Sequence, residues 1–498
     1  MAYRSKKTKQ AEFGDFQTPP ALARQVCQVL AMRGLRPASV VEPTCGAGSF
    51  LFAALDQFVD VRRAIGIEIN LDHLNRVSEE LARKRYARKV FLKHADFFET
   101  DWTEIIRGLP EPTLIVGNFP WVTNSALGSL GSSNLPTKSN FQNHRGLDAI
   151  TGKSNFDISE WMMLRILESC RGRDATIALL CKTAVARKVL VRAWKTGIGL
   201  AQSDIYSICA LDHFDASVDA CLFVCRVSLS TSYDTSLYPS LEANSPTSAI
   251  GYRDHRIIAN TSLFERWKHL AVQGTTVTHR WRSGIKHDCA SVLELERAGS
   301  VYVNGLGETV DLEDDYVYPM LKSSDIANPK ADPSIKWMLV TQCSVGDDTK
   351  VIKHRAPRTW KYLSDHTGLL DGRASVIYKG RPRFAMFGVG PYSFAPWKVA
   401  ISGFYKTLTF RAIGPVRNKP VVLDDTGYFL ACADEEEARS VSTLLNGEAA
   451  QEFFRAFVFW DAKRPITADL LQRLDLTALS RTSGTPVVSF TPIQGSLL

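Results

Sequence analysis

The sequence lacks the long apolar run that a membrane-spanning helix requires. No stretch of its 498 residues approaches the roughly 18 consecutive apolar residues of such a span. The first ten residues carry four basic side chains, but no apolar segment follows them, so they do not form a secretory signal. We therefore expect a protein without membrane contact, located in the cytoplasm.

Clustered cysteines are also lacking. Ten cysteines are spread over the whole chain, which suits reduced thiols in an intracellular protein. The one close pair, Cys221 and Cys225, has the wrong spacing for a zinc knuckle. We expect no bound metal.

The net charge is modest, but its distribution is uneven. The chain carries 60 basic and 52 acidic residues, a formal charge of +8. Between Lys350 and Lys419, 14 basic residues stand against two acidic ones, with many aromatic residues among them. This mixture suits a surface that binds phosphates and packs on sugars or bases. A solvated face over an aromatic core explains it equally well.

The sequence pattern predicts two domains. From Ala38 to about Val227, short apolar runs alternate with longer helix-like segments, the pattern of a parallel sheet covered on both faces. The predicted strands are Val40–Glu42, Ala64–Ile69, Val90–Lys93, Leu114–Val116, Thr176–Cys181, Asp204–Cys209 and Ala220–Val227. The Ser- and Thr-rich stretch after Val227 marks a boundary. We predict an α/β catalytic domain over residues 1–230 and an irregular α+β domain with a C-terminal helical segment over 231–498.

A cofactor signature follows the first predicted strand. Val40 to Phe50 reads as an apolar strand ending in an acid, then a turn of small residues and a helix start. Glycines let such a turn pass close to a ligand. The second strand ends near Glu68, whose carboxylate can accept ribose hydroxyls, and the third is followed by Asp96 and Phe97, which suit an adenine amine and ring. These strand ends predict an adenosine-containing cofactor.

The glycine pattern separates the cofactor classes. Dinucleotide sites prefer Gly-x-Gly-x-x-Gly, but Leu51 stands in place of the third glycine. The pattern Glu-Pro-x-x-Gly-x-Gly instead resembles the first motif of class I methyltransferases that use S-adenosyl-L-methionine. That resemblance places five residues around the methionine portion of the cofactor: Glu42, Thr44, Cys45, Gly46 and Gly48.

A candidate catalytic motif ends the fourth predicted strand. Asn118 is followed by Phe119, Pro120 and Trp121 at the edge where open α/β sheets bind ligands. An exocyclic amine is a poor nucleophile because its lone pair is delocalised. The Asn118 oxygen and the Pro120 carbonyl can accept its hydrogens, while Trp121 stacks on the base. Taken alone, an Asn-x-Pro turn that caps a strand explains the same residues.

The motif Asn118–Trp121 resembles the Asn-Pro-Pro-aromatic tetrapeptide of amino-methyltransferases. Over roughly residues 14 to 227, the sequence resembles N6-adenine-specific DNA methyltransferases of the gamma arrangement, found in bacterial type II restriction-modification systems. The resemblance implies a class I methyltransferase fold, Rossmann-like with a seven-stranded, mostly parallel sheet, followed by a target-recognition domain. It also implicates Thr18 and Pro19 at the methionine end, and Phe214 as the partner that sandwiches the base with Trp121.

The function implied by this resemblance is methylation of the N6 amine of a flipped adenine in double-stranded DNA. Rotating the base out of the duplex costs a few kcal/mol, so the second domain must hold the DNA. Its predicted DNA contacts are Arg282, Lys286, Lys379, Arg381, Arg383, Lys398 and Lys406. Only about a dozen residues precede the first motif, so we expect methylation alone, with a separately encoded cognate restriction endonuclease.

Two features depart from the family or extend it. Phe119 stands where the family usually has proline, which leaves the backbone less restrained and predicts lower turnover. After the motif, residues 122–155 form a long polar stretch, which we interpret as a DNA-contacting loop rather than a disordered one.

Several alternatives stay open on sequence alone. N4-cytosine DNA methyltransferases have similar geometry but more often carry Ser or Asp at the position of Asn118. Enzymes that methylate RNA bases or protein glutamine share the tetrapeptide, although the glutamine enzymes are usually much smaller. A catalytically weakened DNA-binding relative is the remaining alternative, because of Phe119.

Overall fold

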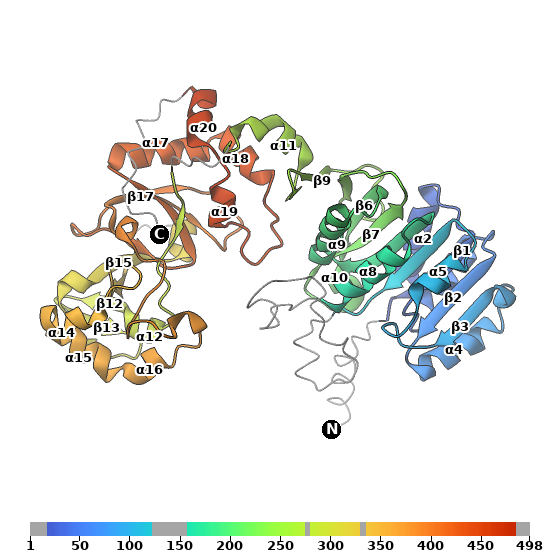
Figure 1. Cartoon of the computed structure of the whole chain (residues 1–498), viewed down its shortest axis with the longest axis horizontal. Coiled ribbons are helices and arrows are strands. Elements are labelled where there is room, and N and C mark those ends of the chain that lie inside the picture. Colours follow the sequence, from blue (N-terminus) through green and yellow to red (C-terminus); the bar gives the residue numbers. More distant parts are fainter. Residues whose placement is uncertain (1–16, 122–156, 274–278, 329–334, 485–498) are drawn as a thin grey trace. The chain divides into compact units, whose positions relative to one another are not determined.

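The computed structural model describes residues 17–121, 157–273, 279–328 and 335–484. It divides into two compact units, Met1–Thr261 and Ser262–Leu498 (Figure 1). The polar stretch 122–155, predicted to contact DNA, lies outside the described residues.

A ten-stranded sheet forms the centre of the first unit, in the order β10-β9-β8-β6-β7-β5-β4-β1-β2-β3. The strands are β1 (Ser39–Glu42), β2 (Arg63–Glu68), β3 (Val90–His94), β4 (Thr113–Asn118), β5 (Ala175–Lys182), β6 (Leu200–Cys209), β7 (Asp219–Val227), β8 (Asp234–Tyr238), β9 (Ser248–Arg253) and β10 (Arg256–Ile258). The seven predicted strands correspond to β1–β7. The predicted number of seven is nevertheless wrong, because three further strands extend the same sheet.

Strand direction creates a ligand-binding edge. Strands β1 to β5 pair in parallel, whereas β7 runs antiparallel between β5 and β6. Strand β1 has β2 on one side and β4 on the other, because the chain passes from β1 to β2 and β3 and then returns to the opposite side of β1 for β4. In open α/β sheets such a reversal opens a crevice at the carboxyl ends of the strands, where ligands bind.

Helices connect these strands and bury their apolar faces. They are α2 (Pro20–Met32), α3 (Ser49–Gln57), α4 (Leu71–Leu81), α5 (Trp102–Arg107), α8 (Ile158–Ser169), α9 (Thr183–Thr196) and α10 (Ala210–Phe214). The core joins Val26 of α2, Leu51 of α3 and Leu114 of β4, all fully buried. Strand β5 is an almost continuous apolar run because both of its faces are buried.

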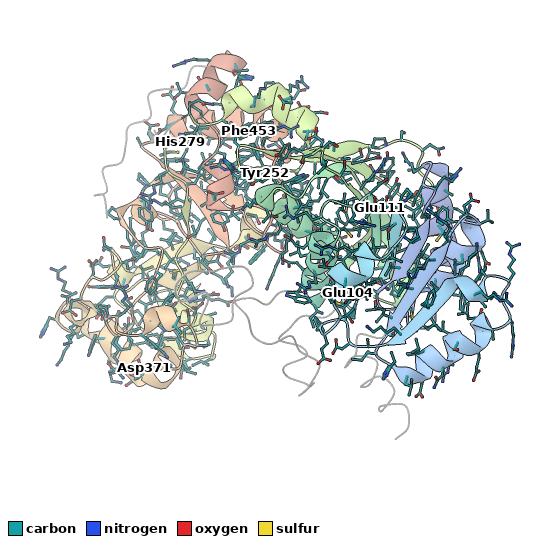
Figure 2. The ribbon with its side chains drawn as sticks, turned by 45° about the vertical axis from the view of Figure 1, so that its right-hand side comes forward. Glu104, Glu111, Tyr252, His279, Asp371 and Phe453 are labelled. Atoms are coloured by element: carbon teal, nitrogen blue, oxygen red, sulfur yellow. The ribbon has the colours of Figure 1, made fainter. Side chains whose placement is uncertain are left out.

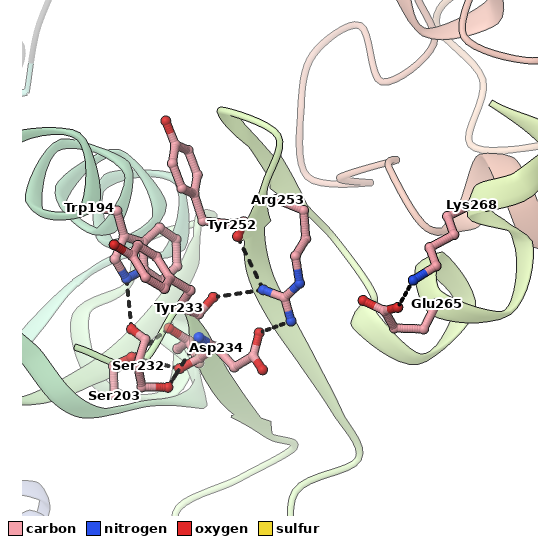
Figure 3. A network of polar contacts seen from close by, with 10 residues as sticks. Trp194, Ser203, Ser232, Tyr233, Asp234, Tyr252, Arg253, Glu265 and Lys268 are labelled. Carbon is pink, nitrogen blue, oxygen red and sulfur yellow. Dashed lines mark hydrogen bonds and ion pairs between the residues drawn. The ribbon is translucent and has the colours of Figure 1, made fainter. Parts of the chain in front are cut away.

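The strands β8, β9 and β10 place the domain boundary later in the chain than the sequence predicts. Strand β8 pairs in parallel with β6, and β9 pairs with β8. Figure 3 shows the polar contacts that fasten them: the indole nitrogen of Trp194 donates to the Ser232 carbonyl oxygen at 3.0 Å, and Arg253 donates to the Asp234 carboxylate at 2.7 Å. The stretch after residue 227 therefore belongs to the sheet. The boundary predicted at residue 230 is too early, and the unit ends at Thr261.

The second unit contains two smaller sheets with short strands, an α+β arrangement. The four-stranded sheet has the order β11-β20-β17-β18 and the six-stranded sheet β14-β13-β12-β16-β15-β19. Their strands are β11 (Arg282–Ser283), β12 (Glu294–Ala298), β13 (Val301–Asn304), β14 (Thr309–Val310), β15 (Val317–Leu321), β16 (Lys336–Leu339), β17 (Trp397–Ser402), β18 (Arg411–Ile413), β19 (Val422–Leu423) and β20 (Gly427–Cys432).

The helices of this unit are mostly short. They are α11 (Thr261–Trp267), which begins at the unit boundary, α12 (Ala290–Leu293), α13 (Ser323–Ala327), α14 (Ile352–Arg355), α15 (Pro357–Asp365), α16 (Thr367–Asp371), α17 (Glu435–Asn446), α18 (Glu448–Arg455), α19 (Ala468–Leu471) and α20 (Leu476–Ser483). Phe453 of α18, labelled in Figure 2, and Phe454 beside it are fully buried. Within the described ranges, no helix is both long enough and apolar enough to cross a membrane.

Candidate active site

Polar residues gather at one edge of the first unit's sheet. Glu42, Glu68 and Asn118 are the last residues of β1, β2 and β4. Because these strands run in parallel, their carboxyl ends meet at the same edge. The structure thus brings together the strand-end residues that the sequence had singled out.

The turn between β1 and α3 allows a ligand to come close to the backbone. Gly46 and Gly48 have φ angles of +48° and +76°, a region that residues with a Cβ rarely adopt. A Cβ on Gly46 would lie 2.6 Å from Gln17 Oε1, so a larger residue would have to displace the Gln17 side chain as well as adopt a positive φ. The Cys45 amide donates to the Ile67 carbonyl oxygen at 2.8 Å and so fastens the turn to β2.

The Glu68 carboxylate borders this turn. Its Oε2 accepts a hydrogen bond from the Gly46 amide at 2.7 Å, and its Oε1 accepts one from the Asn70 amide at 2.8 Å. An ionised carboxylate offers about four acceptor positions. Both oxygens therefore retain capacity for further donors, such as two ribose hydroxyls.

Glu42 stabilises the turn from inside the fold. Its side chain is 3% exposed and accepts from the Leu51 amide of α3 at 2.8 Å. Burial raises the pKa of Glu42 well above its ordinary value, while the amides of Leu51 and Phe50 act in the opposite direction. Glu42 thus fixes the start of α3, a structural role that its residue type alone did not indicate.

The segment that precedes α2 contacts the glycine turn. Gln17 Oε1 accepts from the Ala47 amide at 2.8 Å, and the Ser49 hydroxyl donates to the Thr18 carbonyl oxygen at 2.7 Å. Thr18 is buried, and Pro19 follows it at the start of α2. The two residues implicated by resemblance therefore lie at the turn. Gln17, whose side chain makes the contact with Ala47, was not among the predicted site residues.

Asp96 and Phe97 follow β3 but differ in their surroundings. Asp96 is half-buried, and its Oδ1 accepts from the Phe98 amide at 2.8 Å. Phe97 is 5% exposed, with its ring centroid 4.7 Å from that of Trp102 and 5.4 Å from that of Phe119. The Phe97 ring packs within an aromatic cluster in this structure, and its stacking on an adenine stays a prediction. The same cluster explains Phe119, which is 1% exposed.

Asn118 presents an unpaired oxygen at the end of β4. Asn118 Oδ1 and Trp121 Nε1 are buried, and neither has a hydrogen-bond partner among the described residues. Leaving a buried polar atom unpaired costs about 1–3 kcal/mol, so such atoms are uncommon. The backbone oxygen of Asn118 accepts from Thr44 Oγ1 at 3.3 Å, which joins this strand to the glycine turn. The unpaired oxygen is where a ligand's donor group fits.

Trp121 and Phe214 come together, although they are far apart in the sequence. Their ring centroids lie 5.1 Å apart with an interplanar angle of 65°, an edge-to-face contact. Phe214 is the last residue of α10 and is 7% exposed. The rings leave no room for a base between their faces, so a sandwich requires them to separate.

Two further residues at this edge were not predicted. Lys182, the last residue of β5, donates from Nζ to the Trp121 carbonyl oxygen at 3.0 Å and to Asp157 Oδ2 at 2.5 Å. Asp157 caps α8, because its side chain accepts from the Ser159 amide at 3.1 Å. A polar residue at the end of an apolar strand is the signal that identified Asn118, and it could have identified Lys182.

The predicted DNA contacts of the second unit fall into three groups. The prediction that Lys398 contacts DNA from the surface is wrong. Lys398 is 1% exposed within β17, and its Nζ donates to the Ala395 carbonyl oxygen. Arg383 pairs with Asp371, labelled in Figure 2, at 2.8 Å, and Lys286 pairs with Asp288 at 3.2 Å. Lys379, Arg381 and Lys406 are exposed, and Arg282 is half-buried against the Tyr392 ring. Among the described residues, these last four have no acidic partner within ion-pair distance.

The glycine turn after β1 and the strand-end residues lie at one edge of an α/β sheet in which β1 to β5 pair in parallel. No family model matches the chain. The chain is 45% identical over 482 residues to the Type II methyltransferase M.NspV of Nostoc sp. (strain ATCC 29411 / PCC 7524), which covers 97% of this chain and 99% of the relative. The chain belongs to the type II methyltransferases, and its cofactor is S-adenosyl-L-methionine.

Similar solved structures include restriction-modification enzymes. The Type IIL restriction-modification enzyme MmeI, in complex with DNA, has a TM-score of 0.48 and 13% identity, covering 94% of this chain and 73% of that chain. The type IIG restriction endonuclease BpuSI has a TM-score of 0.39 and 14% identity, covering 95% of this chain and 60% of that chain.

The residues present fit this cofactor. Gly46 and Gly48 have positive φ and no Cβ, so the backbone of the turn can approach a ligand, and Glu68 keeps free acceptor capacity next to it. The unpaired Asn118 Oδ1 lies on the neighbouring strand, linked through Thr44.

Proposed function

We propose that the chain is a site-specific DNA methyltransferase that modifies the N6 amine of adenine in duplex DNA. The observation that carries this proposal is Asn118 Oδ1, a buried acceptor without a partner among the described residues, at the edge that also bears the glycine turn. Membership of the type II methyltransferases supports DNA as the substrate class. The chain order of cofactor turn, catalytic residues and second unit corresponds to the gamma arrangement.

The reaction needs an amine whose lone pair is available. S-adenosyl-L-methionine, when bound, supplies an electrophilic methyl group. Asn118 Oδ1 and the Pro120 carbonyl oxygen accept the two amino hydrogens, which localises the nitrogen lone pair and favours a pyramidal nitrogen. The nitrogen would then form a bond to the methyl carbon while the sulfur–methyl bond breaks and leaves its electron pair on sulfur, and one of the two amino hydrogens would leave as a proton to water. Trp121 and Phe214 contact the faces of the base once their rings have separated.

The cofactor is held at the strand ends. The proposed binding residues are Thr18, Pro19, Glu42, Thr44, Cys45, Gly46, Gly48, Glu68 and Asp96. Glu68 accepts the ribose hydroxyls with the lone pairs that its two amide contacts leave free. Phe97 supports the site from the aromatic cluster behind it.

The second unit supplies contacts to the duplex. Arg282, Lys379, Arg381 and Lys406 have no acidic partner among the described residues, which suits binding to phosphates. Lys286 and Arg383 already pair with aspartates, so each would have to exchange a carboxylate for a phosphate. Methylation by this chain would protect host DNA from a separately encoded restriction endonuclease.

One experiment separates this function from its alternatives. The protein is incubated with a radiolabelled methyl donor and genomic DNA from a host that lacks it, and the DNA is then digested to nucleosides. Label in N6-methyldeoxyadenosine is the expected result. Label in N4-methyldeoxycytidine establishes the alternative base, and label in RNA or protein establishes another substrate. DNA binding without any transfer identifies a weakened relative.

A further inference from the structure

Lys182 joins three elements at the catalytic edge. It ends β5, the strand that pairs with β4, and Leu180 stands opposite Asn118 in the register of the two strands. Its Nζ donates to the carbonyl oxygen of Trp121, the residue that follows Pro120 in the chain, at 3.0 Å. The same Nζ forms an ion pair with Asp157 Oδ2 at 2.5 Å.

The surroundings of this ion pair keep it in one geometry. The Asp157 side chain is 6% exposed and that of Lys182 is 24% exposed, so water screens the pair only weakly. Asp157 Oδ1 is itself held by the amide and the hydroxyl of Ser159, at 3.1 Å and 2.6 Å. The carboxylate is therefore fixed to the start of α8, and it orients the lysine that reaches Trp121.

Trp121 has no comparable contact through its own side chain. Its Nε1 is without a hydrogen-bond partner among the described residues, and its ring meets Phe214 edge to face. Among the described residues, the hydrogen bond from Lys182 to its carbonyl oxygen is a polar contact that fixes the Trp121 backbone. The peptide that joins Pro120 to Trp121 carries the second proposed acceptor, so fixing Trp121 also limits rotation of the Pro120 carbonyl.

We propose that Lys182, oriented by Asp157, is a positioning residue that holds the Pro120 carbonyl oxygen and the Trp121 ring in the arrangement needed for methyl transfer. This inference rests on the proposed function. Lys182 Nζ contacts the Trp121 carbonyl oxygen and Asp157, and not the side-chain oxygen of Asn118. Its effect is geometric, and displacing a positioned group by about 1 Å can reduce a rate about 100-fold.

The test uses the full-length chain and measures three quantities for each variant: the single-turnover methylation rate, the dissociation constant of the cofactor and that of duplex DNA. Lys182→Met removes the donor and keeps the length of the side chain. We expect its single-turnover rate to fall about 10- to 100-fold, with both dissociation constants within twofold of wild type. Lys182→Arg keeps the charge and the donors, so it should recover most of the rate.

The chain offers a matched control in Lys188→Met. Lys188 Nζ pairs with Glu160 of α8 at 2.9 Å, and the Glu160 side chain is 5% exposed, so this pair also ties a lysine to a buried carboxylate of α8. It does not contact Trp121. Lys188→Met should therefore keep a single-turnover rate within twofold of wild type.

Asp157→Asn gives a second approach that preserves folding. Asparagine is as good a helix cap as aspartate, so α8 should keep its start while the ion pair is lost. We expect a rate between those of wild type and Lys182→Met.

The remaining outcomes overturn the inference. A rate for Lys182→Met within twofold of wild type shows that Lys182 does not position the motif. Equal losses in Lys182→Met and Lys188→Met, with lower unfolding temperatures for both, show a general structural role. If wild type methylates no DNA, the proposed function fails first and the inference fails with it.

Discussion

Thr44 Oγ1 donates a hydrogen bond to the backbone oxygen of Asn118 across 3.3 Å. Thr44 lies in the turn that follows β1, and Asn118 ends β4, so this bond connects the cofactor turn to the candidate catalytic residue. Because the Asn118 carbonyl is held, its side-chain oxygen keeps a constant position relative to the glycine turn. The bond thus couples the geometry of the two halves of the site.

Replacing Thr44 with valine should weaken this coupling. One hydrogen bond contributes about 1 kcal/mol, so we expect about a fivefold weaker affinity for S-adenosyl-L-methionine, measured by isothermal titration calorimetry. Thr113→Val is the control, because Thr113 Oγ1 meets Ser39 Oγ at 3.0 Å at the opposite end of the same strands. An equal loss of affinity in both variants would contradict the local role of Thr44.

Asn118→Ala should abolish methyl transfer and leave cofactor affinity within twofold of wild type. The substitution removes an acceptor that is important in the transition state but none of the contacts of the glycine turn. Asn118→Asp keeps an acceptor oxygen and should retain more activity than the alanine variant. Unchanged turnover in Asn118→Ala would refute the catalytic assignment.

Lys379→Ala and Arg381→Ala should each weaken DNA binding. If each side chain meets one phosphate, the slope of log affinity against log salt concentration should fall by about one unit per substitution. Arg358→Ala is the control, because Arg358 is exposed but paired with Asp311 at 2.6 Å. Fluorescence anisotropy over a salt series measures the slopes. Identical slopes for all variants would place the duplex on another surface.

Lys398 should make stability depend on pH. Burial lowers its pKa from 10.5 to about 7 in the folded state. Between these two values the unfolded chain binds a proton that the folded chain does not, so this group's contribution to stability rises with pH. Between pH 7 and 9, the free energy of unfolding of wild type should rise relative to that of Lys398→Met by about 1 kcal/mol per pH unit. Unfolding temperatures of both proteins across this range test it, and a constant difference would contradict the lowered pKa.

A fragment that ends at Thr261 should fold and bind the cofactor, whereas one that ends at residue 230 should not. The longer fragment keeps β8 against β6 and the hydrogen bond from Trp194 to Ser232. The shorter one exposes the edge of β6 and loses that bond. Circular dichroism and cofactor titration compare the two, and equal stability would show that β8–β10 are dispensable.

The sequence predicted strands β1 to β7 of the first unit because the signal for each of them is local. An apolar run followed by Glu42, or by Asn118, marks a buried strand and its carboxyl end at once. The strands β8–β10 escaped prediction because β8 lies in a stretch rich in Ser and Thr, and only the pairing of β8 with β6 and of β9 with β8 shows that they extend the sheet. Composition there resembles that of a linker.

The directions of the side chains could not be predicted from the sequence either. The sequence places Phe97 directly after β3, but only packing shows that its ring turns toward Trp102 and Phe119. Lys398 counted as one charge in a basic segment. Its apolar neighbours Val399 and Ala400 signal a buried strand, which a count of charges over seventy positions cannot register.

The contact between Trp121 and Phe214 must be broken before a base can lie between the two rings. Opening an aromatic pair costs about 0.5–1.5 kcal/mol, and stacking a base returns about 1–3 kcal/mol. A free nucleoside would gain little from this exchange and would also lose its translational freedom. Under the proposed function, a nucleotide that stays attached to a bound duplex would lose far less, so the closed pair of rings would favour polymeric substrates over monomers.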